Sequence, residues 1–316
     1  MCCVKTLVRQ DKYQIISFKK THITEIRDLY NKAYNRKKPL KIFKYKLDKT
    51  PYGKPIAHLM KYRKSIVGFY VIAPIIIKVN DKKILGGMSF LTMTHPDHQR
   101  KGIFSKLAKK TYTVAKKKGY KFILSFSVNK NSINGFKKIG FVSNPIYYTR
   151  ISLKNKLAEK YPSSVEKRFP KKIEKLWNEF ENRKHYKIQP EKNNKFFQWR
   201  YKKNPTKYIT IFEKGKYFII LKKFNNILHI VDFFGNINNL DEIVIKSAIQ
   251  EGKKLQCDQI TAWWPKNPHY KKIKKITLKK IRSPNYFVIK KFDKNLTSDI
   301  LELKNWYFTM AESDVF

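Results

Sequence analysis

The chain has 316 residues, of which 42% are hydrophobic and 15% aromatic, and its formal net charge is +47. This length and apolar content suffice for one large domain or two ordinary ones, so folding needs neither disulfides nor a structural metal. The longest apolar run, residues 66–79, is interrupted by Pro74 and is too short to span a membrane. We therefore expect a globular protein with no membrane span.

The positive charge has two interpretations. Only ten of the 70 basic residues are arginine, and the lysines are spread along the whole chain. A compositionally biased genome would produce such enrichment, whereas a functional origin would imply acidic partners or substrates. Proteins that read nucleic-acid sequence favour arginine, which is scarce here, so nucleic acid is an open but not a favoured partner.

The cysteines bear on the cellular compartment. Cys2, Cys3 and Cys257 form neither a disulfide framework nor a metal-ligand pattern. The first fourteen residues lack an apolar segment that would direct export. The sequence therefore predicts a cytoplasmic protein without a bound metal.

The first half of the chain predicts a mixed α/β layer in the order β-α-β-β-β-α-β-α-β. Residues 36–55 contain three prolines and a glycine and are predicted as a basic connector. Alternation or short apolar runs predict strands, and apolar spacing of three and four predicts helices. The strands are expected at 13–18, 56–62, 65–79, 85–94, 120–128 and 141–151, and the helices at 21–33, 103–118 and 132–139.

The second half repeats part of this order. A polar, proline-containing segment with a helix at 166–181 comes first, and a helical segment is expected after Pro268. Strands are predicted at 208–212, 217–222, 228–233, 258–264 and 286–290, with a helix at 240–250. We therefore divide the chain into a first domain at 1–153, a helical bridge at 154–194 and a second lobe at 195–316.

A polar loop between strand and helix is the first candidate site. Gln99, Arg100, Lys101 and Gly102 follow an apolar strand and lead into the helix at 103–118. Amides at a helix start, together with two cations, suit a pyrophosphate, although the loop could also merely begin a helix. Backbone groups at residues 92–94 could pair with an extended, amide-bearing ligand.

Two motifs carry a family resemblance. The stretch 91–103, LTMTHPDHQRKGI, resembles motif A of the GNAT (GCN5-related) N-acetyltransferases, and the stretch 128–141, VNKNSINGFKKIGF, resembles motif B. The resemblance covers residues 13–151 and implies a mixed-sheet GNAT fold with acetyl-CoA as co-substrate. The cofactor-binding residues that it implies are Thr92, Met93, Thr94, Gln99, Arg100, Lys101, Gly102, Ile103, Phe104, Ser105 and Asn129.

The sequence departs from the family pattern where catalysis is expected. Phe104 replaces a small residue of the loop. Phe136 stands where many members have a tyrosine that acts as general acid, and Leu124 stands where some have a carboxylate that acts as base. The chain is then either an acyltransferase that takes its acid and base from elsewhere or a binding relic. Candidate acids are Tyr147 and Tyr148, which strand packing would equally explain. Candidate bases are His95 and Asp97, and Asp97 could instead cap a turn.

The second half resembles the degenerate halves of two-lobed GNAT proteins, because residues 234–240 lack both cations and the glycine spacing of the loop. A lobe without a cofactor loop would shape the acceptor pocket. The acidic stretch 306–316 is either a solvated tail or a segment that folds into the cleft. In the second case Phe316 or Asp314 could supply a carboxylate base, as in the enhanced-intracellular-survival type.

The resemblance implies transfer of an acetyl group to a primary amine of a small molecule or amino sugar, by direct attack on the thioester. One alternative is a nucleic-acid-associated or regulatory binding protein on a GNAT scaffold. Another is an aminoacyl or longer-acyl transferase of cell-envelope precursors. The amine, the acyl chain and the oligomeric state stay open at this point.

Overall fold

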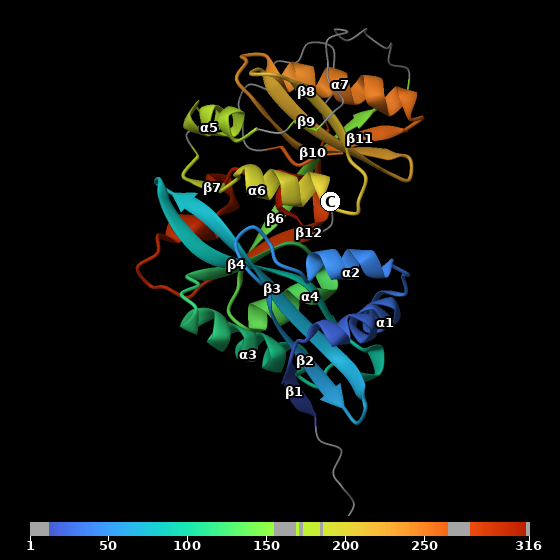
Figure 1. Ribbon diagram of the computed structural model, residues 1–316, viewed down its shortest axis with the longest axis vertical. Coiled ribbons are helices and arrows are strands. Elements are labelled where there is room, and N and C mark those ends of the chain that lie inside the picture. Colours follow the sequence, from blue (N-terminus) through green and yellow to red (C-terminus); the bar gives the residue numbers. More distant parts are fainter. Residues whose placement is uncertain (1–12, 155–168, 171–172, 184–185, 265–278, 314–316) are drawn as a thin grey trace, which may run out of the picture. The chain divides into compact units, whose positions relative to one another are not determined.

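The computed structural model describes residues 13–154, 169–170, 173–183, 186–264 and 279–313 (Figure 1). Contacts divide the chain into two compact units, described separately below. The first unit comprises Met1–Asp48, Lys54–Ala73 and Ser89–Gly119. The second comprises Lys49–Gly53, Pro74–Met88 and Tyr120–Phe316.

The first unit is built on an antiparallel meander. Strands β1 (Gln14–Ser17), β2 (Ile56–Tyr62), β3 (Ser65–Val79) and β4 (Lys82–Thr94) are neighbours in this order, and both β3 and β4 continue along the chain into the second unit. The predicted bounds of β2 and β3 match the structure at every residue. The strands predicted in this half are therefore confirmed.

The described part of the first unit also contains the helices α1 (Ile23–Tyr34), α2 (Leu40–Lys46) and α3 (Ile103–Lys117). Helix α2 lies inside the segment predicted as a connector. It begins after Pro39, whose fixed φ suits a helix start, and it buries Phe43 completely in the core of the unit. One buried aromatic residue thus makes a helix of a segment that composition assigns to a loop.

The second unit contains the sheet order β4-β5-β12-β6-β11-β10-β9-β8. Strand β12 (Lys279–Lys291) lies between β5 (Phe122–Asn129) and β6 (Val142–Ser152), and its Ile289 pairs with Leu124 on one side and Val142 on the other. Helix α4 (Lys130–Lys138) joins β5 to β6. A strand from the end of the chain therefore completes the sheet of motif B.

The ranges 1–153, 154–194 and 195–316 that the sequence suggests stay a prediction, and the compact units group β5 and β6 with the C-terminal half. The reason is the position of β12, which hydrogen-bonds to both β5 and β6 and so joins them to the C-terminal half.

The C-terminal half repeats the topology of the N-terminal half. Strands β8 (Ile209–Glu213), β9 (Tyr217–Phe224) and β10 (Ile227–Gly235) are antiparallel, and helix α7 (Leu240–Lys254) leads to β11 (Gln259–Ala262), which is parallel to β10. The order β2-β3-β4-α3-β5 ends in the same way, with β4 parallel to β5. Helix α7 packs on β9, β10 and β11 (Figure 1).

The second unit also contains several short elements. They are α5 (Glu174–Arg183), β7 (Ile188–Pro190), α6 (Asn194–Phe197), a π-helical turn η3 (Gln198–Lys202) and the 3-10 turns η5 (Ser298–Leu301), η6 (Leu303–Asn305) and η7 (Met310–Glu312). The helical segment expected after Pro268 lies outside the described residues. Within the described ranges, no helix combines the length and apolar character needed to cross a bilayer.

The acidic C-terminal stretch is part of the core as far as it is described. Trp306, Tyr307 and Met310 are buried, and Ser313 is 2% exposed. The interpretation of residues 306–313 as a solvated tail is therefore wrong. Asp314 and Phe316 lie outside the described residues, so the carboxylate proposed there stays a prediction.

Candidate functional site

Strand β4 is distorted where the sequence places the pantetheine contacts. Its ladder with β5 pairs Gly87 with Ile123 and Met88 with Leu124. Leu91 then adopts φ 46, a left-handed conformation that is strained for a residue with a Cβ. Strain of this kind persists where the surrounding structure or a function requires it.

The three residues after Leu91 differ in how far they are buried. Met93 is buried in the first unit, whereas Thr92 and Thr94 are half-buried. The hydroxyl of Tyr34 donates to the carbonyl oxygen of Thr92 over 2.7 Å. One of the backbone groups expected to face a ligand is thus already occupied by a side chain of α1.

The loop after β4 has the backbone of an anion site. Arg100 has φ 61 and Gly102 has φ 71, and Gly102 is the N-cap of the fifteen-residue helix α3. No side chain caps this helix, and its first turn contains no acidic residue. Its first amides therefore have no intrahelical acceptor. Gln99, Arg100, Lys101 and Gly102 are all exposed beside them.

Close packing fixes the start of α3. A Cβ on Gly68 of β3 would lie 2.5 Å from Cγ2 of Ile103, so glycine at 68 lets the first residue of α3 lie directly on the sheet. The ring of Phe104 packs edge to face on the buried Tyr70, with 5.6 Å between ring centroids. This contact explains how phenylalanine fits at a loop position where the motif usually has a small residue.

His95 lies in a cluster of rings at the base of the loop. It is the N-cap of the 3-10 turn η2 (Pro96–His98), and its Nδ1 accepts from the amide of Asp97 over 3.4 Å. Its ring meets that of His98 at 5.6 Å, and Tyr13 hydrogen-bonds Nδ1 of His98 over 2.8 Å. Burial, aided by Lys101 and His95, lowers the pKa of His98.

The other predicted site residues lie in the second unit. The Oδ1 atom of Asn129 accepts from the amide of Ser132 over 2.9 Å and thereby caps α4. Tyr147 on β6 is 42% exposed, and Lys280 Nζ lies 4.4 Å from its ring centroid. The Oη atom of Tyr148 accepts from Arg150 Nη2 over 2.9 Å.

Two of the three departures from the family pattern, Leu124 and Phe136, are core residues. Leu124 is 1% exposed, and Phe136 is 3% exposed with its ring 5.0 Å from that of Phe141. Both side chains stabilise the second unit by burial and carry no group that transfers a proton. Any acid or base must come from other residues.

Residues 14–141 match the family model described as an acetyltransferase (GNAT) domain. This part of the chain is similar to GNAT domains. The match confirms the resemblance seen in the two motifs, and it makes the protein an acyltransferase. No curated protein sequence matches the chain.

Solved structures share the fold over about nine-tenths of the chain. A conserved protein from Enterococcus faecalis V583, described as a probable N-acyltransferase, superposes with a TM-score of 0.67 at 8% identity, covering 89% of this chain and 73% of its own. A putative acetyltransferase from Pyrococcus horikoshii gives 0.59 at 13% identity, covering 91% and 92%. Saccharomyces cerevisiae N-myristoyltransferase with bound myristoyl-CoA gives 0.62 at 12% identity, covering 91% and 80%. The predicted mixed-sheet α/β fold of the GNAT acyltransferases is therefore confirmed, and the second GNAT-like lobe stays a prediction.

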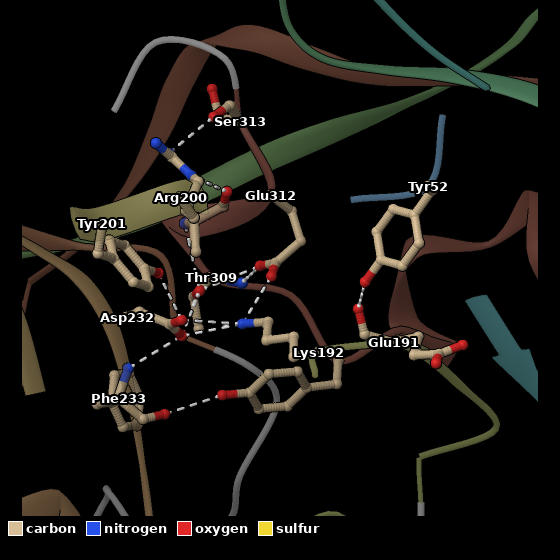
Figure 2. Close-up of polar contacts among 12 residues, drawn as sticks. Tyr52, Glu191, Lys192, Arg200, Tyr201, Asp232, Phe233, Thr309, Glu312 and Ser313 are labelled. Carbon is tan, nitrogen blue, oxygen red and sulfur yellow. Dashed lines mark hydrogen bonds and ion pairs between the residues drawn. The ribbon is translucent and has the colours of Figure 1, made fainter. Parts of the chain in front are cut away.

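The structure adds a buried charged cluster that the sequence analysis missed (Figure 2). Lys192 is inaccessible to solvent and forms ion pairs with Asp232 over 3.0 Å and with Glu312 over 2.8 Å. One signal was present in the sequence, because Asp232 interrupts the apolar run 227–234 of a predicted strand. A carboxylate at such a position must find a partner if it is buried.

Proposed function

We propose that the protein is an acetyl-CoA-dependent N-acetyltransferase that acts on the primary amine of a small molecule or amino sugar. The observation that carries the proposal is the uncapped start of α3, where free amides lie beside Arg100 and Lys101. Among the described residues, no carboxylate pairs with either cation. Such a site favours a multiply charged anion such as the pyrophosphate of CoA.

The strand before the loop would hold the pantetheine arm. The left-handed residue Leu91 alters the direction of the β4 backbone next to Thr92, Met93 and Thr94. When bound, acetyl-CoA supplies the thioester carbonyl that the amine attacks. An amide of the strand near Met93 would donate to the carbonyl oxygen as negative charge develops on it. The family resemblance also assigns Asn129 to the contact near the sulfur of the arm.

The remaining steps are proton transfers. His95 is our candidate base, because its imidazole follows directly after the end of β4, next to the proposed thioester site. Tyr148 is a candidate acid for the thiolate, and the Arg150 guanidinium holds its hydroxyl in place. Tyr147, which is more exposed, is the second candidate acid. A carboxylate at Phe316 stays a candidate base.

The acyl group could be longer than acetyl. The yeast N-myristoyltransferase, whose structure contains myristoyl-CoA, shares the fold of this chain. We favour acetyl because the matching family model is that of an acetyltransferase domain. Assays with acetyl-, octanoyl- and myristoyl-CoA distinguish the two cases.

The test is a thiol-release assay with each acyl-CoA and a panel of amines, amino sugars and peptides, with products identified by mass spectrometry. We expect release of CoA that depends on an amine and a product heavier by one acetyl group. Tight CoA binding without thiol release on any acceptor would overturn the proposal in favour of a binding protein. Salt-sensitive retention on DNA without CoA binding would favour the nucleic-acid alternative.

A further inference from the structure

Three separate elements meet at the ammonium group of Lys192. Lys192 follows β7, Asp232 belongs to β10 and Glu312 belongs to η7. Around the same Nζ atom lie three aromatic rings, at 4.8 Å for Trp177, 5.9 Å for Phe196 and 5.6 Å for Tyr307. We call Lys192, Asp232 and Glu312 the lysine clamp.

The carboxylate of Asp232 is saturated with donors. Both of its oxygens lie 3.0 Å from Lys192 Nζ, and Tyr201 Oη donates over 2.6 Å. The Thr309 hydroxyl and the Phe233 amide each donate over 3.1 Å. Burial alone would lower the pKa of Lys192, but the two carboxylates outweigh burial and raise it, so the lysine stays charged.

Arg200 also hydrogen-bonds to the segment that contains Glu312. Its Nε donates to the carbonyl of Ala311 over 3.1 Å and its Nη2 to the carbonyl of Ser313 over 3.2 Å (Figure 2). Glu312 in turn accepts from the amide and hydroxyl of Thr309. Residues 309–313 are therefore held through side chains and backbone alike.

Irregular backbone geometry orients Asp232, Arg200 and Tyr201. The register of β10 against β9 shifts between Ile230 and Asp232, so a bulge precedes the aspartate. Arg200 and Tyr201 lie in the π-helical turn η3. Bulges and π-turns are retained mostly where they direct a side chain, and a buried ionic cluster contributes little net stability. Three such features at one segment indicate that holding it serves more than packing.

The residues just before the held segment pack on β5 and β12 of the second unit. Phe308 stacks on Phe126 of β5 at 5.8 Å and 26°, and Trp306 packs on Phe287 of β12 at 5.4 Å. Strand β5 also carries Leu124 and ends at Asn129, the predicted contact near the thiol. Displacement of Phe308 would therefore loosen β5 along the part that precedes Asn129.

We propose that Lys192 is a positioning residue for acyl transfer, which pins residues 309–313 so that Phe308 holds β5 in its productive position. This inference rests on the proposed function. It assigns to the second lobe a role in the reaction itself, in addition to any role in shaping the acceptor pocket.

Two variants separate positioning from folding. Lys192→Met alone leaves two buried carboxylates unpaired and is expected to unfold. The triple variant Lys192→Met, Asp232→Asn and Glu312→Gln removes all three charges together and should keep a cooperative fold. The matched control, Lys78→Met with Glu181→Gln, removes a different ion pair of the second unit, in which Glu181 is buried and Lys78 is 24% exposed.

We expect the triple variant to lose about tenfold to a hundredfold in kcat, to keep its affinity for CoA and to exchange the amides of residues 306–313 faster. The control variant should keep the kcat of the natural protein and its rate of amide exchange at residues 306–313. Phe308→Ala should lose kcat to a similar extent without altering any charge. An unchanged kcat in the folded triple variant would overturn the inference, as would unchanged exchange at 306–313. If the natural protein released no thiol, the proposed function would fail, while amide exchange would still test the clamp.

Discussion

At the scale of single residues, His229 links stability to pH. It is buried on β10, its Nδ1 lies 2.7 Å from the hydroxyl of Thr261, and burial with help from Lys222 lowers its pKa to about 4. A histidine whose pKa is depressed stabilises the fold above its unfolded pKa of about 6.5, and this contribution is lost as the pH falls toward 4. The loss amounts to about 3 kcal/mol.

The test compares His229→Gln with the natural protein by urea unfolding at pH 7 and pH 4. The natural protein should lose about 3 kcal/mol more than the variant between these two values, because the variant has no proton to take up at this position. Parallel losses in the two proteins would show that His229 is not held neutral by the fold.

At the scale of elements, the pairing of β4 with β5 depends on close packing of the Phe122 ring against the backbone of Gly86. A Cβ on Gly86 would lie 2.2 Å from Cζ of Phe122, and Phe122 is fully buried. Gly86→Ala should therefore destabilise the protein by about 1–3 kcal/mol through overpacking. Phe122→Leu makes room, so the double variant should be more stable than the sum of the two single effects allows. Additive effects in thermal or urea unfolding would contradict this contact.

The elements also show how far the sequence could predict this molecule. Strands β2 and β3 and helix α3 follow directly from apolar periodicity, because each buries one regular face or run. Helix α2 escaped prediction because only the burial of Phe43 reveals it. The loop of the candidate site was recognisable because its amides and cations are local in sequence. The lysine clamp was not, because Lys192 and Glu312 are distant along the chain and meet only in the fold.

At the scale of the whole molecule, the position of β12 makes the two halves dependent on each other. Periodicity predicts this strand but not its partners, and the structure places it between β5 and β6. A chain that ends at residue 153 lacks β12, so both strands lose a hydrogen-bonded neighbour. We expect such a chain to show no cooperative unfolding by circular dichroism, in contrast to the full chain. Cooperative unfolding with CoA binding by residues 1–153 would show that the first domain folds alone.

The most direct test of the central claim is equilibrium CoA binding by variants of the two glycines that flank α3. Gly102 and Gly119 have φ values of +71 and +80, and no heavy atom lies within 4 Å of a Cβ built on either. Glu at both sites brings the same strain and charge, but only Gly102 adjoins the proposed pyrophosphate site. By titration calorimetry, Gly102→Glu should weaken CoA binding by more than about tenfold, or ~1.4 kcal/mol, and Gly119→Glu should leave it unchanged. Equal affinities for the two variants would contradict binding of CoA at the start of α3.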